Sequence, residues 1–291
     1  MTFRCSDASR ERGEPRWATA STVSAFLLLE DPGPWGPHVL QSRRLPDAVR
    51  PTLRTWSREL GLRTLLIRRP GRALGGTRRV FVANSHHGWL QSTTVDDLAA
   101  VADLDVAGLH RAAGVGLTPH DDPVLLVCTH GVHDRCCAER GRPLAAALAQ
   151  RWPDEVWEAS HLGGDRFAGN LVALPHGDYF GGLDADVGPH VVARYLDGEI
   201  DLEHHRGRSS HAWVVQAAVH AGRERFGAVG VRDVVVRGVE TRGSGTDVRL
   251  AVRGTTRTAH ITVGSGQVGQ LTCQAEHEEA PPRYEVSWDD S

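Results

Sequence analysis

The sequence of 291 residues contains no lysine, so its positive charge apart from histidine comes entirely from arginine. It also lacks a strong excess of either charge, because 33 basic and 36 acidic residues leave a net charge of −3. Such a chain does not carry the basic surface that nucleic acids or anionic membranes select. We therefore expect neither a nucleic acid nor a membrane among its partners.

Long apolar segments are missing as well. No run of about 18 uncharged apolar residues occurs, which disfavours a membrane-spanning helix. The opening stretch MTFRCSDASRERGEPRW carries charges where a secretion signal carries its apolar part. With 40% hydrophobic residues the composition is ordinary for a globular protein, and we expect a cytoplasmic location.

The sequence shows no catalytic constellation. Aspartate and glutamate are spread evenly along the chain, and no paired carboxylates of the kind used by glycoside hydrolases are recognisable. We accordingly do not expect an enzyme.

Cysteine is scarce, yet its distribution is the most informative feature of the chain. The number of cysteines is five, an odd number that does not suit the paired framework of a disulfide-rich secreted domain. Three of the five fall in the stretch CTHGVHDRCC, between Cys128 and Cys137, beside two histidines and an aspartate. This grouping favours metal binding or redox chemistry.

The pattern of apolar runs predicts an α+β chain in three parts. Residues 1–118 hold strand-like runs and one helix and form an α+β segment of unknown role. Residues 119–227 contain an α/β unit in which the strands PVLLVC and EVWEAS flank a helix, with Pro143 near its first turn. A hairpin and two further helices follow this unit. Residues 228–291 alternate short β-branched runs, GQLTCQAE among them, with turns, and predict an antiparallel sheet with a partly frayed acidic tail.

The β-α-β unit predicts which residues lie together. Its two strands are expected to be parallel neighbours, so both strands end at the same edge of the sheet, where open α/β sheets usually bind ligands. Cys128 ends the first strand, and the loop after the second strand carries His161 and Asp165. These two side chains are therefore expected to face Cys128, Cys136 and Cys137.

Two glycines in the same loop, Gly163 and Gly164, are consistent with a cofactor site. Glycine has no side chain and lets the backbone approach a bulky group closely. We therefore expect a metal ion or a cluster between the two loops.

Three segments also carry a resemblance to a known family. CTHGVHDRCCAERGRPLAAAL, VWEASHLGGDRFAGNLVALPHGDYFGGL and HRGRSSHAWVVQAA together resemble the sucrase/ferredoxin-like family, also described as thioredoxin-like ferredoxins. The similarity is strongest over residues 120–220. The resemblance implies a thioredoxin-like ferredoxin domain over residues 119–227 that holds a [2Fe–2S] cluster with two cysteines and two histidines.

The ligands that the resemblance implies can be carried over position by position. The family's two cysteines, separated by eight residues, match Cys128 and Cys137, and the first histidine of its second motif matches His161. Asp165 stands where the family has its second histidine. Asp165 either ligates iron or forms hydrogen bonds beside it, and in the second case Cys136 or water completes the site.

Other histidines and cysteines have less specific interpretations. His130 and His133 are expected to be loop residues bonded to the backbone, because a cluster needs only four protein ligands. Cys5 and Cys273, taken singly, are expected to pack as small apolar side chains. A strained disulfide between the adjacent residues Cys136 and Cys137 is a further alternative.

The function that follows is one-electron transfer, with an unidentified redox protein as donor or acceptor. One alternative is a thiol-disulfide protein, which the absence of a Cys-x-x-Cys motif disfavours. A zinc-binding interaction module is the other, because the same residue types suit tetrahedral zinc. The sequence does not indicate an oligomeric state.

Overall fold

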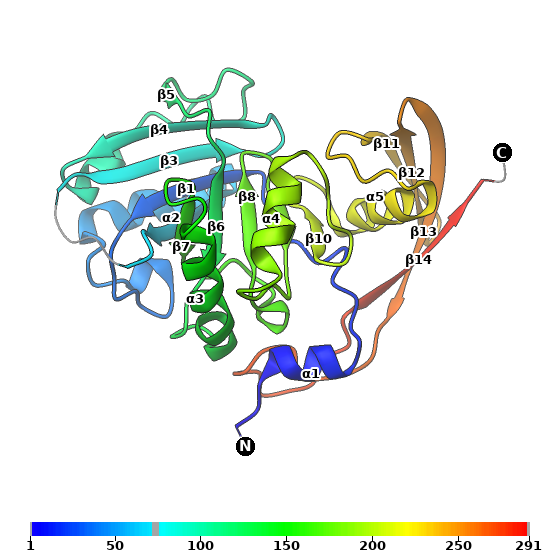
Figure 1. Cartoon of the computed structure of the whole chain (residues 1–291). Coiled ribbons are helices and arrows are strands. Elements are labelled where there is room, and N and C mark those ends of the chain that lie inside the picture. The colour runs from blue at the N-terminus through cyan, green and yellow to red at the C-terminus, as the bar shows by residue number, and fades with distance from the viewer. Residues whose placement is uncertain (1, 72–75, 290–291) are drawn as a thin grey trace.

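The computed structural model describes residues 2–71 and 76–289 and contains a large curled sheet, a small antiparallel sheet and the helices that cover them (Figure 1). The elements up to residue 119 are α1 (Cys5–Glu11), β1 (Ala25–Glu30), η1 (Val39–Gln41), η2 (Asp47–Val49), α2 (Arg50–Leu60), β2 (Leu62–Arg68), β3 (Arg78–Asn84), β4 (Trp89–Val95), η3 (Leu98–Asp103) and β5 (Thr118–Pro119). Those that follow are β6 (Val124–Cys128), α3 (Arg135–Ala149), β7 (Val156–Ala159), η4 (Asp165–Phe167), β8 (Leu171–Leu174), β9 (Asp178–Phe180), α4 (Gly188–Leu196), β10 (His205–Arg208), α5 (Trp213–Phe226), β11 (Val234–Arg242), β12 (Gly245–Val252), β13 (Thr255–Ser265) and β14 (Pro282–Trp288). The mixture of helices and strands confirms the predicted α+β class.

The large sheet is built from two halves of the same topology. In the first half β1 pairs in parallel with β2 and antiparallel with β3, which pairs with β4. In the second half β6 pairs in parallel with β7 and antiparallel with β8, which pairs with β9. One helix, α2 or α3, connects the parallel strands of each half. The halves meet where β2 pairs antiparallel with β7, so the order β10-β9-β8-β6-β7-β2-β1-β3-β4-β5 forms one continuous sheet.

The first half therefore belongs to the same sheet as the half that carries the cysteine motif. The division predicted at residues 118 and 119 falls inside β5, the last strand of this sheet. The β-α-β unit and the hairpin predicted for the second half are both present.

Both faces of the central strands are buried, which explains their continuous apolar sequences. In β1, Phe26 and Leu28 belong to a core shared by the two halves, whereas Leu27 and Leu29 pack on the other face. All five residues of β6 are buried. Such strands read as unbroken apolar runs rather than as alternating patterns.

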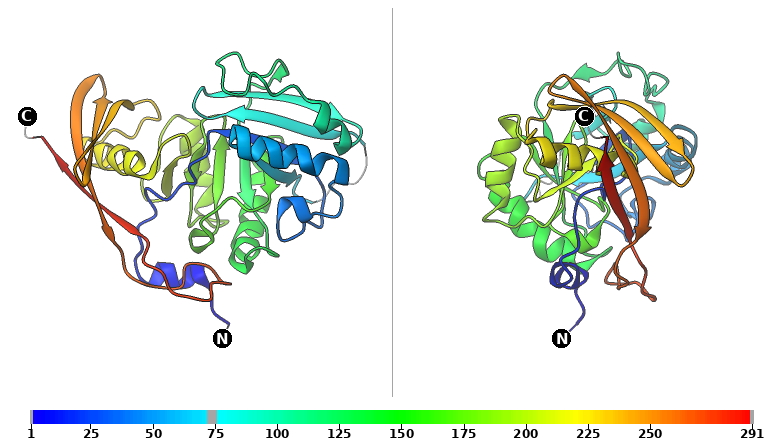
Figure 2. Two further views of the ribbon diagram at one scale, coloured as in Figure 1. Left: turned by 180° about the vertical axis from the view of Figure 1, so that it is seen from behind. Right: turned by 90° about the vertical axis from the view of Figure 1, so that its right-hand side faces the viewer.

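The C-terminal residues form the small sheet β11-β12-β13-β14, covered by α5 (Figure 1). The tail predicted to be partly frayed forms a strand over Pro282–Trp288, because Tyr284, Val286 and Trp288 of β14 alternate toward the core beneath α5, and its last two residues lie outside the described part of the chain. The predicted strand GQLTCQAE is wrong. It lies in the connection between β13 and β14, residues 266–281, which runs back beside α1 (Figure 2).

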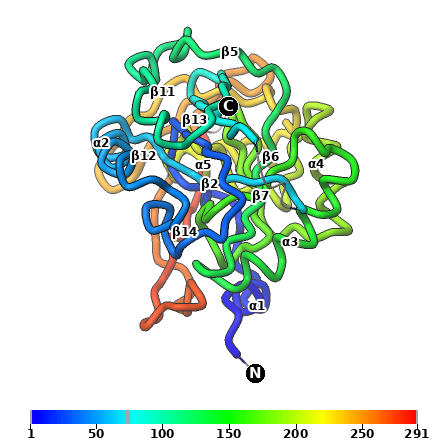
Figure 3. Tube along the Cα trace, turned by 90° about the vertical axis from the view of Figure 1, so that its left-hand side faces the viewer, coloured from blue at the N-terminus to red at the C-terminus, as the bar shows by residue number. Residues whose placement is uncertain are grey.

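Helix α1 lies against the start of α3, far from the sheet that follows it in the sequence (Figure 3). Two ion pairs connect the helices: Arg4 binds Glu139 through two contacts of 2.6 Å, and Arg140 lies 2.7 Å from Asp7. The two terminal segments therefore meet at one end of the second half. In the part of the chain that the structure describes, no helix combines the length and the apolar character needed to cross a membrane.

A buried ion pair between Arg68 of β2 and Glu158 of β7 lies where the two halves of the sheet join. Its contribution to stability can be tested by mutation. Glu158 lies 2.5 Å from the guanidinium of Arg68, with side-chain exposures of 12% and 7%. We expect Glu158→Gln to lower the free energy of unfolding by about 3 kcal/mol, because it leaves a buried charge without its partner. Glu59→Gln, which removes an exposed partner of Arg58, should cost less than about 1 kcal/mol. Urea unfolding of both variants measures the difference, and equal small losses would contradict this account of the junction.

Candidate metal centre

The strand pairing brings the predicted residues to one edge of the sheet. β6 ends at Cys128, directly opposite Ala159, the last residue of β7. The segments that follow both strands therefore leave at the same edge. The ligand atoms of Cys128, Cys137 and His161 lie within 4.8 Å of one another there.

Helix α3 begins earlier than the sequence suggested, and this start positions the cysteine pair. Its first residue is Arg135, so Pro143 lies inside the helix rather than near its first turn. Asp134 is the N-cap, since its carboxylate accepts a hydrogen bond of 2.8 Å from the Cys136 N–H. Gly141 lets the helix approach the carbonyl of Cys128, where a Cβ atom would not fit.

The two adjacent cysteines of α3 point to different surroundings, because consecutive helical residues are rotated by about 100°. Cys137 belongs with Cys128 and His161, whereas the Cys136 sulfur lies 3.4 Å from that of Cys273 and 3.8 Å from that of Cys5. The alternative in which Cys136 supplies a fourth ligand to the first group is therefore wrong. The vicinal disulfide is also absent, since all five cysteines are free.

Asp165 faces the same group from the loop after β7. Its Oδ1 atom accepts a hydrogen bond of 3.1 Å from the Cys137 sulfur and lies 3.0 Å from Nδ1 of His161. The residue is only 4% exposed. The position at which the sequence departs from the family motif thus lies beside the three other predicted ligands.

The donor atoms have the character of metal ligands. Nδ1 of His161 is buried and makes no hydrogen bond, and its near polar neighbour is Oδ1 of Asp165, at 3.0 Å in an ion-pair contact. Buried polar atoms normally have such a partner. A thiol pair, an unpartnered imidazole nitrogen and a carboxylate form a set that fits a metal or an iron–sulfur cluster.

The electrostatics of the group favour the thiolate of Cys128 and the carboxylate of Asp165, whereas Cys137 and His161 hold their protons more tightly than usual and would release them on binding a metal. The neighbouring Cys137 thiol and the imidazole of His161 lower the pKa of Cys128, while Cys128 in turn raises the pKa of Cys137. Burial alone would lower the pKa of His161, but Asp165 and Cys128 raise it to about 9. Burial would raise the pKa of Asp165, yet His161 keeps it below its ordinary value.

The backbone of the His161 loop is fixed from several sides. Gly163 and Gly164 have φ angles of 97° and 76°, which non-glycine residues rarely adopt. A side chain at Gly164 would run into the guanidinium of Arg206. Both glycines thus lie against protein side chains, Gly163 against Ser21 and Gly164 against Arg206.

Arg206 is the important residue that the sequence did not reveal. Its guanidinium is buried and donates hydrogen bonds of 2.8 Å to the Gly163 carbonyl and to the Asn170 side chain. It also bonds the Thr19 carbonyl at 2.5 Å. Burial lowers its pKa to about 10, so it remains charged at neutral pH. In the sequence, Arg206 is distinguished only by its place in HRGRSSHAWVVQAA. This segment contributes to the family resemblance, but no role was assigned to its residues.

His130 and His133 bind backbone carbonyls, as predicted. Nε2 of His130 lies 2.8 Å from the Gly36 carbonyl, and its Nδ1 accepts from the His161 N–H at 3.1 Å. Nδ1 of His133 is 3.3 Å from the Pro37 carbonyl, and its ring stacks on His161 at 3.7 Å. His161 also borders a cavity of about 170 Å³, which is lined by Pro37, His38, Val39, Arg63, Thr64, Leu65, His130, His133 and His161.

Comparison with protein families identifies the family of the chain. The family model for sucrase/ferredoxin-like proteins matches residues 17–207. The chain belongs to the sucrase/ferredoxin-like family. The residues matched include Cys128, Cys137, His161 and Asp165 but exclude Cys5 and Cys273. Comparison with curated proteins and with solved structures gives no match.

The raised pKa of His161 gives a prediction for the metal-free protein. We expect an NMR titration to place this pKa at about 9, against an ordinary value near 6.5. Because the folded state holds the proton more tightly, the resulting stabilisation is complete below about pH 6.5 and disappears as the pH rises to about 9. Asp165→Asn keeps the shape but removes the charge, so it should lower this pKa. A wild-type value near 6.5, or no change in the variant, would show that Asp165 does not control His161.

Proposed function

We propose that Cys128, Cys137, His161 and Asp165 hold a [2Fe–2S] cluster and that the protein is a one-electron carrier. The observation that carries this proposal is the meeting of two buried thiols with the unpartnered imidazole nitrogen of His161 at one sheet edge. Family membership supports it. Bound there, the cluster would supply reversible one-electron chemistry.

The donors form two chemically different pairs, which suits a centre of two irons. Rieske clusters likewise have cysteines on one iron and two histidines on the other. In this protein the second pair is His161 and Asp165. A neutral imidazole leaves less negative charge on the centre than a thiolate does, whereas the carboxylate restores one negative charge.

The protein's own charges would tune the reduction potential. The buried cation of Arg206 lies close enough to Asp165 and Cys137 to interact with both electrostatically. A fixed positive charge favours the state that has gained an electron. Arg166, the residue after Asp165, is paired with Glu14 at 2.6 Å.

His161 is also the point from which a partner protein would exchange electrons. Its side chain is 27% exposed, while the two cysteines of the site are 0–1% exposed. The imidazole edge and its neighbouring cavity therefore offer access to an otherwise buried centre. A redox protein that docks over His161 is the partner that this arrangement suits.

A zinc module is the second candidate, because ligand atoms within 4.8 Å also suit a single ion. The thiol-disulfide alternative is disfavoured by the burial of both cysteines, since exchange requires access to a sulfur atom.

Metal analysis separates the cluster from zinc. Full-length protein purified without oxygen should contain about two irons and two acid-labile sulfides per chain and absorb visible light. Cys128→Ser and Cys137→Ser should lose both elements, because each removes a thiolate from the site. Cys136→Ser, the adjacent cysteine in the same helical turn, should retain iron and sulfide. Stoichiometric zinc without sulfide at this site, or loss of iron only in Cys136→Ser, would refute the assignment.

Asp165 is tested by its effect on the midpoint potential. If its carboxylate ligates iron, Asp165→His should retain the cluster and raise the potential, because a neutral ligand replaces an anionic one. Asp165→Ala should then lose iron. Redox titration and iron analysis of both variants measure these effects. An alanine variant with full iron and an unchanged potential would exclude ligation by Asp165.

A further inference from the structure

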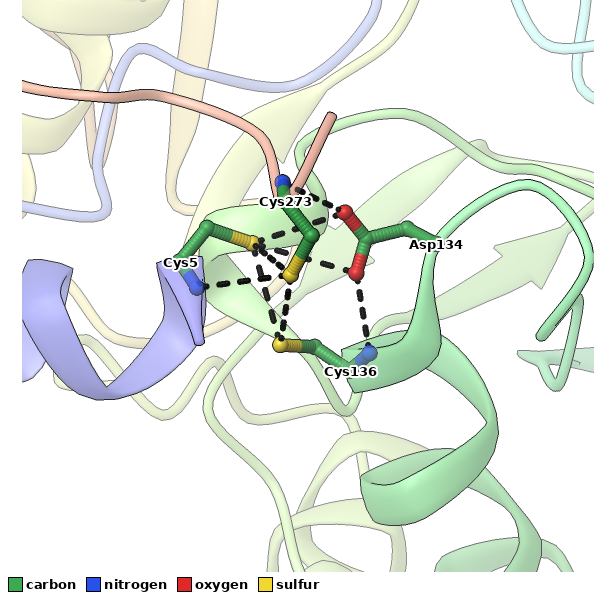
Figure 4. Close-up of side chains that lie close together, drawn as sticks. All are labelled: Cys5, Asp134, Cys136 and Cys273. Atoms are coloured by element: carbon green, nitrogen blue, oxygen red, sulfur yellow. Dashed lines mark hydrogen bonds between the residues drawn. The ribbon is translucent and has the colours of Figure 1, made fainter. Parts of the chain in front are cut away.

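The three cysteines outside the first site also converge. Cys5 begins α1, Cys136 lies in the first turn of α3, and Cys273 lies in the connection between β13 and β14. Their sulfur atoms are 3.8 Å apart for Cys5 and Cys136, 3.4 Å for Cys136 and Cys273, and 3.5 Å for Cys273 and Cys5. The carboxylate of Asp134 faces the same point, with its oxygens 3.6 and 3.8 Å from the Cys5 sulfur (Figure 4).

These separations match the ligand shell of a single ion. With Zn–S bonds of about 2.3 Å and Zn–O bonds of about 2.0–2.2 Å, a tetrahedral site separates two sulfurs by about 3.8 Å and a sulfur from an oxygen by about 3.5 Å. The observed sulfur–sulfur distances of 3.4–3.8 Å lie within a few tenths of an ångström of this value. They are far from the disulfide length of about 2.05 Å. Ligands on the different irons of a cluster would stand farther apart.

The carboxylate is held in place by the backbone. Oδ1 of Asp134 accepts from the Cys136 N–H at 2.8 Å, and Oδ2 accepts from the Cys273 N–H at 2.9 Å. Each ionised oxygen keeps a further lone pair for an ion. The Cys5 N–H lies 3.5 Å from the Cys273 sulfur as a donor. Hydrogen bonds of this kind orient the ligands of a metal site.

Apart from the ion pairs between α1 and α3, the surrounding structure offers little apolar packing to hold these segments together. The local apolar cluster consists of Cys5, Cys136 and Ala168, with Cys273 packed against it. Residues 266–281 contain one isolated bridge, between Gly269 and Glu279, and otherwise no regular strand or helix. A connection of this length without regular structure is uncommon in a compact domain unless it has a function.

We propose that Cys5, Cys136, Cys273 and Asp134 bind one zinc ion, which fastens both terminal segments to the start of α3. A thiolate-rich tetrahedral set with every position filled is the arrangement of structural rather than catalytic zinc. The site is independent of the proposed cluster, because the two centres share no ligand. Cys5 and Cys273 also lie outside the residues that the family model matches.

Element-resolved analysis of the full-length protein tests the zinc site. We expect one zinc per chain in addition to the iron, and zinc-edge X-ray absorption showing three sulfur ligands and one oxygen ligand. Cys273→Ser should weaken zinc binding by more than about tenfold, because it removes one of four ligands. Iron and sulfide measured in the same samples separate loss of zinc from loss of the cluster.

Two further measurements decide the matter even if Cys273→Ser does not fold. Metal-stripped protein titrated with Co²⁺ should develop the charge-transfer absorption of a tetrahedral thiolate site, and Cys128→Ser, which removes a ligand of the first site alone, should keep this band. Thiol labelling after denaturation in chelator should find all five cysteines reduced. A chain that retains no zinc and gives no cobalt band, a zinc ion with two sulfur ligands and a histidine, or a disulfide among these three cysteines would each overturn the proposal.

Discussion

The chemistry of this protein depends on where helix α3 begins. Asp134 caps the helix, so the first turn carries Cys136 and Cys137 on different sides. Cys137 turns toward Cys128 at the end of β6, and Cys136 turns toward the terminal segments. One hydrogen bond, from the Cys136 N–H to the Asp134 carboxylate, thus fixes the helix start that directs two adjacent thiols to two separate groups. A helix that began six residues later, near Gly141, would leave both cysteines in a loop without a fixed direction.

The duplicated topology of the large sheet gives the first half a role that its sequence did not suggest. Only the second half carries the Cys128 motif, but the first half supplies the groups that hold it. The carbonyl of Gly36 positions His130, which in turn accepts from the His161 backbone. Arg63 of β2 donates to the His161 carbonyl at 2.8 Å. The candidate site is thus built on one half and fixed by the other.

The sequence predicted the features that depend on local patterns and on the rules of parallel sheets. Unbroken apolar runs located β1 and β6, and the β-α-β rule placed His161 beside Cys128 although the two residues are far apart in the sequence. Contacts between segments that are distant in the sequence could not be predicted. Cys5 and Cys273 are separated by 268 positions and carry no shared motif. The role of Arg206 could not be predicted either, because it depends on burial of the side chain. The four residues of β10 are too few to show a pattern from which that burial could be predicted.

Electron paramagnetic resonance tests most directly whether a [2Fe–2S] cluster is bound through His161. The dithionite-reduced protein should give the signal of one reduced [2Fe–2S] centre. Pulsed measurements should detect coupling to the nitrogen of a coordinated imidazole, and this coupling should change when the histidines are labelled with nitrogen-15. An iron-containing protein that gives no such signal, or a signal without coupling to a histidine nitrogen, would contradict the account.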